Sequence, residues 1–433
     1  MRSRLLIVVS QWTMVLKVAI LLYADDVALI AEDEGQLQSM LDILSAWCSR
    51  WHLKVNPIKS AVVHFRASSV TRTTETFYCG DAQLPIVSQY RYLGLLFTET
   101  LNYETMTTCA AKAASRALGV IIAKSKVMGG MPYATFKKLY DTTVWPIMEY
   151  GACIWGTREH ASVNAVQRRA CQHLLGVGRF TPTAAINGDM GWTLPSERQW
   201  LAVSRVWYRC CTMRHDRVNS RIFRWGNNAA DARSRNWCLR VRHQLDSLGL
   251  GHFGQVDTVP LLVRRPFLRS VASRLSNRRD HQWLQEVNRV HAKRGTGASK
   301  LRTYKTFKQA YETEQYVVEL MPRTHRSAMA KFRSGTAPLR LETGRYEQLP
   351  VERRTCFLCA QAVETEQHVL TECPLYEDIR CSLYEEAEQF YSGFKDYDNG
   401  TKMKTILSSV QLVKPASKAC KLILDRRNTF FYQ

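Results

Sequence analysis

Residues 18–31 read VAILLYADDVALIA, two short apolar runs on either side of the pair Asp25-Asp26. Runs of this length that are rich in Val, Ile, Leu and Tyr are typical of buried β-strands, so the segment predicts a hairpin with both aspartates at its turn. Adjacent carboxylates repel one another unless a cation neutralises them, and Mg²⁺ binds one or two protein carboxylates together with water and phosphate oxygens. The pattern therefore indicates a divalent-metal site. An ordinary polar turn is the alternative.

The residues after this hairpin continue an α+β pattern. Asp33 to Gln36 has the form of a helix capping box. Apolar side chains then recur at helical spacing, at Leu37, Met40, Leu41, Leu44, Trp47, Cys48 and Trp51. This spacing predicts an amphipathic helix. Residues 61–66 (AVVHFR) and 90–97 (YRYLGLLF) predict further strands, the second of which ends at Gly94.

From about residue 104 the pattern becomes helical. An Ala-rich helix is expected to reach Val127, a Gly-Gly-Met-Pro break follows at 129–132, and a helix at 133–150 is expected to kink or end at Pro146. Further along, the sequence predicts a helix at 161–175, a loop or linker at 226–260, a helix at 267–293 and a closing helix at 374–394. The chain thus predicts an α+β fold whose later part is mostly helical.

The net charge is high and unevenly distributed. The 433 residues carry a formal charge of +22, whereas residues 201–310 alone hold 23 basic against 6 acidic side chains. Arginines and aromatic residues alternate there, which suits contact with phosphates and stacking on single-stranded bases. The candidate nucleic-acid-binding residues are Arg209, Arg224, Arg240, Arg242, Arg264, Arg265, Arg278 and Arg279. A merely solvated basic face is the alternative.

The thirteen cysteines form no repeating framework, so a disulfide scaffold is excluded and a reducing compartment, cytoplasm or nucleus, is expected. Four residues nevertheless form a C-x2-C-x8-H-x4-C pattern: Cys356, Cys359, His368 and Cys373. Three thiols and an imidazole suit tetrahedral Zn²⁺. Cysteines that pack as small hydrophobic residues are the alternative, but the glutamates at 364, 366 and 372 make this segment too polar for a core.

An apolar stretch from Leu5 to Leu22 could be read as a membrane anchor. Gln11, Thr13 and Lys17 interrupt it, and no small-residue cleavage site follows. We therefore expect an intracellular protein without a membrane span.

Tyr23-Ala24-Asp25-Asp26, a YADD motif between apolar strands, resembles the signature of reverse transcriptases from non-LTR retrotransposons. Val55-Asn56-Pro57-Ile58-Lys59-Ser60 and Tyr90-Arg91-Tyr92-Leu93-Gly94 follow in the order found in that family. The resemblance, to transposable elements of the CR1 and Jockey kind, continues through Trp145-Pro146-Ile147, Tyr150-Gly151, Ile154-Trp155-Gly156 and Gln167-Arg168-Arg169 to the last cysteine motif. It covers most of the chain.

The resemblance implies roles for individual residues. Asp25 and Asp26 would bind the Mg²⁺ ions of a two-metal site, and Lys59 would approach the leaving pyrophosphate. Tyr92, Leu93 and Gly94 would form the turn that positions the primer. The plainer alternatives are a surface lysine at Lys59 and a core strand that ends in a turn glycine.

The sequence also departs from the family. Only 22 residues precede Tyr23, whereas the family places fingers, a first palm strand with a metal-binding Asp, and a Gln-Gly nucleotide-pocket motif before this hairpin. Residues 1–17 match nothing expected there. Without the third carboxylate the metal would be held loosely, so we expect a carboxy-terminal RNA-directed DNA polymerase fragment that is inactive by itself.

These expectations combine into one domain map: a partial reverse transcriptase palm at 1–100, a helical thumb at 101–200, a basic nucleic-acid-binding region at 201–310, a zinc knuckle with its closing helix at 311–395, and a tail at 396–433. The expected partners are an RNA template and a DNA primer or target, with dNTP as substrate only in the full-length parent. The alternative function is a stand-alone zinc protein that binds RNA or single-stranded DNA without polymerisation.

Overall fold

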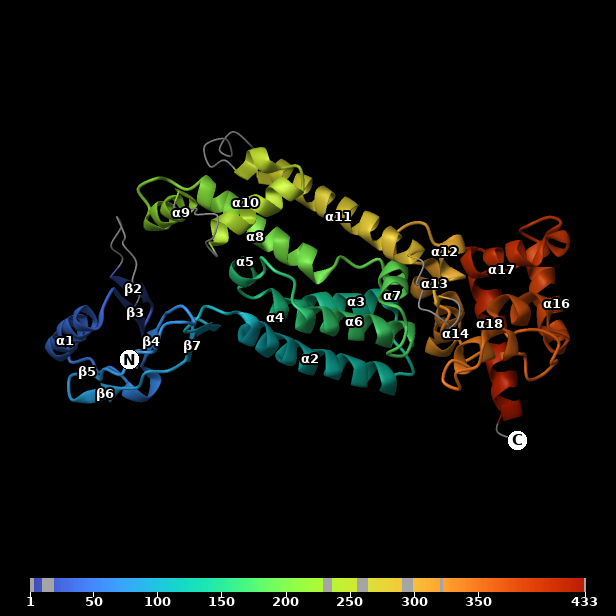
Figure 1. Cartoon of the computed structure of the whole chain (residues 1–433), viewed down its shortest axis with the longest axis horizontal. Helices are drawn as coiled ribbons and strands as arrows, with labels where there is room; N and C mark the ends of the chain where they lie inside the picture. Colours follow the sequence, from blue (N-terminus) through green and yellow to red (C-terminus); the bar gives the residue numbers. More distant parts are fainter. Residues whose placement is uncertain are drawn as a thin grey trace. The chain divides into compact units, whose positions relative to one another are not determined.

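The Asp25-Asp26 hairpin forms one edge of a four-stranded sheet (Figure 1). The computed structural model describes residues 4–9, 19–228, 236–254, 264–289, 299–319 and 322–431. Strands β2 (Ile20–Tyr23) and β3 (Asp26–Ala31) pair antiparallel, with Tyr23 opposite Asp26. The predicted hairpin is confirmed, with Asp25 in its turn and Asp26 at the start of β3. The expectation that both strands are buried is wrong for β2, whose four residues are exposed at the sheet edge.

The centre of this sheet is a strand that the sequence did not predict. Its order is β2-β3-β1-β4, and β1 (Arg4–Val9) runs parallel to both β3 and β4 (Ala61–His64). We expected residues 1–17 to lie outside the resemblance, yet residues 4–9 occupy the position next to the acidic strand. Half of the apolar stretch considered as an anchor, residues 10–18, lies outside the described residues. Among the described helices, none is long and apolar enough to cross a membrane.

Helix α1 (Glu34–Arg50) connects β3 to β4 and covers one face of the sheet. Asp33 accepts a hydrogen bond from the backbone N–H of Gln36 at 2.8 Å, as the capping pattern predicts. Leu37 and Leu41 are fully buried against the sheet. Each such side chain contributes roughly 1.5 to 3 kcal/mol by leaving water.

Only some of the apolar residues along α1 are buried in the core. Trp47 and Trp51 are 51% and 61% exposed, with ring centroids 6.4 Å apart. Their spacing from Leu37 predicted burial with the other apolar residues, but both side chains lie outside the buried cluster that α1 forms with the sheet.

Two small hairpins complete the β-structure. The first joins β5 (Phe77–Cys79) and β6 (Ala82–Leu84) and was not predicted. The second corrects an expectation, because residues 90–97 form β7 (Gln89–Tyr92) and β8 (Leu95–Thr98) rather than one strand. Leu93 and Gly94 make the turn with φ angles of 46° and 81°. Gly94 suits this left-handed conformation, which is unfavourable for Leu93 by about 1 kcal/mol.

The helical segment begins with α2 (Glu104–Val127), as predicted. The helix expected at 133–150 is divided into α3 (Tyr133–Leu139), a π-helical turn η2 (Tyr140–Val144) and α4 (Trp145–Glu149). Pro146 lacks the N–H that an α-helix needs at this point, and the wider turn before it accommodates the missing hydrogen bond.

The remaining elements follow in chain order. They are α5 (Ala152–Trp155), α6 (Ala161–Leu175), α7 (Thr183–Met190), α8 (Pro195–Cys211), α9 (Val218–Asn228), α10 (Trp237–Ser247), η3 (Gly251–Gly254), α11 (Arg264–Asn288), α12 (Tyr304–Phe307), α13 (Gln315–Glu319), α14 (Arg323–Arg333), α15 (Arg340–Thr343), η5 (Val351–Arg353), η6 (His368–Glu372), η7 (Pro374–Tyr376), α16 (Glu377–Glu388), η8 (Phe394–Asp396), α17 (Asn399–Ser408) and α18 (Val413–Phe431).

Two of these elements correct the sequence analysis. Helix α10 lies within 226–260, which we expected to be a loop or linker; its Leu239, Val241 and Leu245 are buried. In place of the tail expected after residue 396, the chain forms α17 and α18, and α18 packs against α14 and α16 (Figure 1).

The chain forms two compact units that do not follow its sequence order. The first contains residues 1–110, 151–160 and 203–262, and the second contains 111–150, 161–202 and 263–433. The sheet therefore lies in the first unit and the Cys/His pattern in the second. The basic segment 201–310 contributes to both units, and the functional domain map stays a prediction.

Candidate metal centres and nucleic-acid interface

The first candidate centre is the carboxylate pair of the hairpin. Ala24 adopts a left-handed conformation with φ of 51°, which lets the chain reverse within two residues. Asp25 is exposed at the tip and Asp26 is half-buried where β3 begins. The two carboxylates are thus displayed at the end of the sheet, where solvent or a substrate can reach them.

The predicted primer turn lies next to this pair. Tyr90 and Tyr92 pack with Val87 over Ala28 and Val63, on the face of the sheet opposite α1. Burial raises the pKa of the Tyr92 phenol, and the nearby negative charge of Asp26 raises it further. The structure therefore brings Tyr92, and with it the Leu93-Gly94 turn, close to one of the predicted metal ligands.

Lys59 is placed by a short capped turn. The side-chain oxygen of Asn56 accepts hydrogen bonds from the backbone N–H groups of Ile58 and Lys59 at 3.1 and 3.3 Å. The Tyr90 hydroxyl donates to the Lys59 carbonyl, which ties this turn to β7. The Lys59 side chain is exposed and, within the described part of the chain, forms no ion pair with Asp25 or Asp26.

The donor set at the hairpin fits one hydrated Mg²⁺ better than two ions. The strand beside Asp26 is β1, whose Arg4 is its register partner. A two-metal site needs carboxylates from more than one strand to bridge both ions, and here β1 supplies none.

The second candidate centre is the Cys/His pattern, which the structure brings together completely. Cys356 and Cys359 lie on a tight turn closed by a hydrogen bond from the Ala360 N–H to the Cys356 carbonyl at 2.9 Å. A bridge between Thr355 and Val363 aligns the two sides of this loop. His368 begins the π-helical turn η6, and the Cys373 N–H donates to the His368 carbonyl at its end.

The four ligand atoms converge on one point. They all lie within 4.8 Å of one another, with 4.0 Å between the sulfurs of Cys356 and Cys373 and 3.3 Å between Cys359 Sγ and His368 Nε2. Tetrahedral zinc with bonds near 2.3 Å separates its sulfur ligands by about 3.7 Å. The residues therefore fit the ligand set of a tetrahedral zinc ion, with the ligand atoms slightly farther apart than in a zinc-bound site.

The thiols of this cluster have unequal pKa values. Burial raises the pKa of Cys356, and it raises that of Cys373 to about 12. Burial also opposes ionisation of Cys359, but backbone N–H groups and the two neighbouring thiols outweigh it and lower the pKa of Cys359. A bound cation would stabilise all three thiolates.

The eight predicted nucleic-acid-binding arginines divide equally between the two units. Arg209, Arg264 and Arg265 are exposed, and Arg224, Arg240, Arg242 and Arg278 are half-buried. Arg279 has a structural partner set: its guanidinium is 12% exposed and donates to Glu197 and Asp280 while it stacks on Tyr311 at 4.2 Å. The three exposed arginines can therefore be reached by phosphates, whereas the Arg279 guanidinium is already paired within the protein.

Sequence reasoning missed the buried ionic core of the second unit. Asp189 and Arg333 are 2% and 1% exposed and form two hydrogen bonds, at 2.9 and 3.0 Å. Tyr304 and Tyr316 also donate to Asp189. No local pattern marks this pair, because its members are 144 positions apart in the chain.

The segment that contains the hairpin is similar to known proteins. Residues 4–97 match the family model described as reverse transcriptase (RNA-dependent DNA polymerase). The match starts within the segment that we expected to lie outside the resemblance. A protein from Drosophila melanogaster named as a probable RNA-directed DNA polymerase from transposon BS is 28% identical over 151 residues, which are 34% of this chain.

The chain covers 17% of the length of that relative. No solved structure matches the chain. Residues 4–97, which contain the sheet, the acidic hairpin and the Tyr92 turn, are thus similar to a reverse transcriptase domain.

Proposed function

We propose that this chain derives from the reverse transcriptase of a non-LTR retrotransposon of the CR1 and Jockey kind, an enzyme of RNA-templated DNA synthesis. The observation that supports this most strongly is the position of Tyr92 beside Asp26 within the segment similar to reverse transcriptases. A polymerase needs its metal-binding carboxylates next to the end of the primer, and this arrangement provides that proximity.

Each residue at the hairpin then has a defined task. Asp25 and Asp26 would hold Mg²⁺, which would polarise the primer hydroxyl and the transferred phosphate. The Tyr92-Leu93-Gly94 turn supports the primer end. Lys59, displayed by the Asn56 cap, neutralises charge on the departing pyrophosphate.

The polypeptide as given binds nucleic acid without extending a primer. Its hairpin offers two carboxylates and the neighbouring strand β1 offers none. A missing bridging carboxylate removes several kcal/mol of transition-state stabilisation, and each 1.4 kcal/mol is about tenfold in rate. The converging ligand atoms of Cys356, Cys359, His368 and Cys373 favour the second candidate, an intracellular zinc protein that binds RNA or single-stranded DNA in the nucleus or cytoplasm.

Primer extension tests the proposal. The chain, Asp25→Asn and the control Asp42→Asn are incubated with an RNA template, a DNA primer, dNTPs and Mg²⁺. Asp42 is an exposed carboxylate on α1, away from the turn. We expect binding of the template-primer by all three proteins and incorporation by none. Incorporation that persists in Asp42→Asn and disappears in Asp25→Asn would show that two carboxylates suffice, and absence of binding would contradict both candidates.

A further inference from the structure

Two carboxylates lie inside the loop between the zinc-type ligands Cys359 and His368. Glu364 and Glu366 are 0% and 1% exposed, yet neither belongs to the set of converging ligand atoms. An ionised carboxylate that leaves water without a partner is strongly destabilising. These two residues must therefore be held by something other than the metal.

Glu366 is held by Arg302, which lies in the segment that leads into α12. The guanidinium forms a two-pronged contact: Nε donates to Oε2 at 3.2 Å and Nη2 donates to Oε1. The Thr303 hydroxyl also donates to Oε2 at 3.4 Å. Two-pronged pairs of this kind fix orientation as well as distance.

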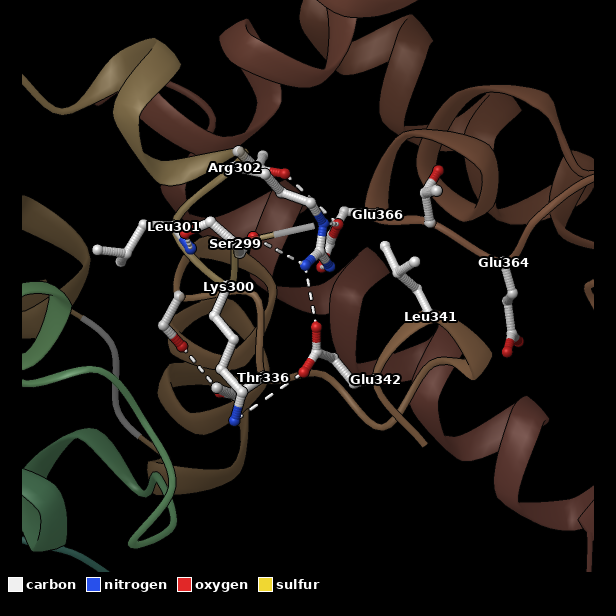
Figure 2. Close-up of polar contacts among 12 residues, drawn as sticks. Ser299, Lys300, Leu301, Arg302, Thr336, Leu341, Glu342, Glu364 and Glu366 are labelled. Atoms are coloured by element: carbon white, nitrogen blue, oxygen red, sulfur yellow. Dashed lines mark hydrogen bonds and ion pairs between the residues drawn. The ribbon is translucent and has the colours of Figure 1, made fainter. Parts of the chain in front are cut away.

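Arg302 simultaneously reaches a second carboxylate. Its Nη1 donates to Glu342 of α15 at 2.9 Å and to the Ser299 carbonyl at 3.2 Å. Figure 2 shows this guanidinium between Glu366 and Glu342, with Lys300 on the other side of Glu342. The Arg302 side chain thus connects the loop between Cys359 and His368 to α15 and to the segment before α12.

Glu364 is held in the same manner from the opposite end of the chain. Arg427 of α18 donates from Nε to Oε1 at 2.9 Å and from Nη2 to Oε2 at 3.1 Å. Arg427 is itself only 4% exposed. The backbone N–H of Arg340 donates to the same carboxylate. The loop is therefore fastened to α18 by a fully buried pair.

A third carboxylate faces the ligand histidine. Nε2 of His368 points to Cys359, so Nδ1 points away from the ligand cluster, and Glu372 Oε2 lies 3.5 Å from it. Glu372 is anchored in turn by Gln367 at 2.8 Å and by Asn399 of α17 at 3.3 Å. The contact is an ionic one rather than a hydrogen bond, since Nδ1 has no hydrogen-bond partner among the described residues. A carboxylate on this side of a ligand imidazole limits the orientation of the ring.

We propose that Glu364, Glu366 and Glu372 are positioning residues of the Cys356, Cys359, His368 and Cys373 site, and that Arg302 and Arg427 couple its zinc occupancy to the packing of α18 and of residues 299–303. The inference rests on the proposed zinc site. Because coupling is reciprocal, loss of zinc loosens α18, and loss of either arginine weakens zinc binding. The knuckle, residues 356–373, then folds as part of the second unit rather than as an independently folding zinc finger.

Zinc affinity of the full chain tests this directly. Arg302→Met and Arg427→Met remove the guanidinium and keep much of the apolar stem, and Arg302→Lys keeps the charge. Lys418→Met, at an exposed position of α18, is the matched control. Affinity is measured by competition with a chelating dye, and ligand geometry by the absorption spectrum of the Co²⁺-substituted protein. We expect a 10-fold to 100-fold loss for both Met variants, partial recovery in Arg302→Lys, an altered Co²⁺ spectrum, and a change below about threefold in the control.

Hydrogen exchange of the unmodified chain gives a second test that needs no variant. Removal of zinc with a chelator should speed exchange in α18 and at 299–303 as well as in the loop itself. Unchanged zinc affinity in both Met variants, or faster exchange confined to residues 355–373, would overturn the coupling while leaving the zinc site intact. If the unmodified chain binds no zinc, the site itself and the coupling both fail.

Discussion

The two candidate metal centres differ in how completely the fold supplies them. At the hairpin, two carboxylates stand at the edge of a sheet, one exposed and one half-buried, and the neighbouring strand adds no ligand. At the knuckle, four ligand atoms converge within 4.8 Å, and three carboxylates nearby are held by side chains from the segment before α12, from α18 and from α17. A metal centre is complete when its ligands and their supports come from one folded unit. By this measure the Cys/His cluster has four ligand atoms and their supports within one unit, whereas the hairpin has two carboxylates and no ligand from the neighbouring strand.

The largest expected effect is at the knuckle. Cys359→Ser should abolish stoichiometric zinc binding, because three ligands hold the ion far less tightly than four and a short polar loop has no core of its own. Limited proteolysis should then cut after about residue 350 while the first unit stays intact. Cys381→Ser, an exposed cysteine outside the pattern, is the control. If its removal strips the zinc and removal of Cys373 does not, the fourth ligand is wrongly assigned.

The buried pair in the same unit should show the next largest effect. Asp189→Ala leaves Arg333 buried with only Glu314, at 3.1 Å, as a charged partner. Breaking a buried pair in this way typically costs about 3 to 5 kcal/mol. Denaturant unfolding measures this loss. The control is Asp378→Ala, because Asp378 is exposed and pairs with Arg426 at the surface. A loss below about 1 kcal/mol would mean that the ionic core contributes little to the unit that carries the knuckle.

Nucleic-acid binding should depend on salt more than on either metal centre. On the order of five phosphate contacts with single strands implies a loss of roughly two decades of affinity over a fivefold rise in salt. Arg209→Ala should weaken RNA binding and lower this slope, whereas Arg279→Ala should lower stability instead, because its guanidinium is already paired with Glu197 and Asp280. A flat salt titration, or equal effects of both variants on binding, would contradict the assignment.

Acid should destabilise the knuckle-bearing unit through His173. Burial, reinforced by Arg323 and Lys126, lowers the pKa of His173 to about 4. The unfolded chain takes up this proton near pH 6.5 and the folded chain only near pH 4, so stability falls as the pH drops through that window, by on the order of 2 to 3 kcal/mol. His173→Gln should flatten the pH dependence, and His281→Gln, an exposed histidine, should not. If the stability of His173→Gln falls with pH as steeply as that of the unmodified chain, another group causes the pH dependence.

The features predicted correctly from the sequence are the local ones. The hairpin, helix α1 and the clustering of the four Cys/His side chains are each encoded within about 20 residues, where spacing and capping residues determine the outcome. Helix α10 was missed because Asn, Asp and Ser around it suggest a loop, although Leu239, Val241 and Leu245 share a face. The division of 90–97 into two strands falls at the turn that the resemblance implies for Tyr92, Leu93 and Gly94, and Leu93 adopts a left-handed conformation there.

The supports of the knuckle could not be predicted because they join distant segments. Arg302 and Arg427 are 64 and 63 positions from the glutamates that they bind. The glutamates appeared in the sequence only as evidence against a hydrophobic core. Their actual role follows from burial, since a charged group that leaves water must find a partner wherever the fold provides one.

Metal content of the purified chain tests the contrast between the two centres most directly. The protein is prepared without chelator, dialysed against buffer that contains Mg²⁺ and then against metal-free buffer, and analysed for zinc and magnesium by mass spectrometry. We predict close to one zinc and no retained magnesium per chain, with the zinc unaffected by the double change Asp25→Asn and Asp26→Asn. Absence of zinc, or a retained divalent ion that this double change removes, would contradict the account.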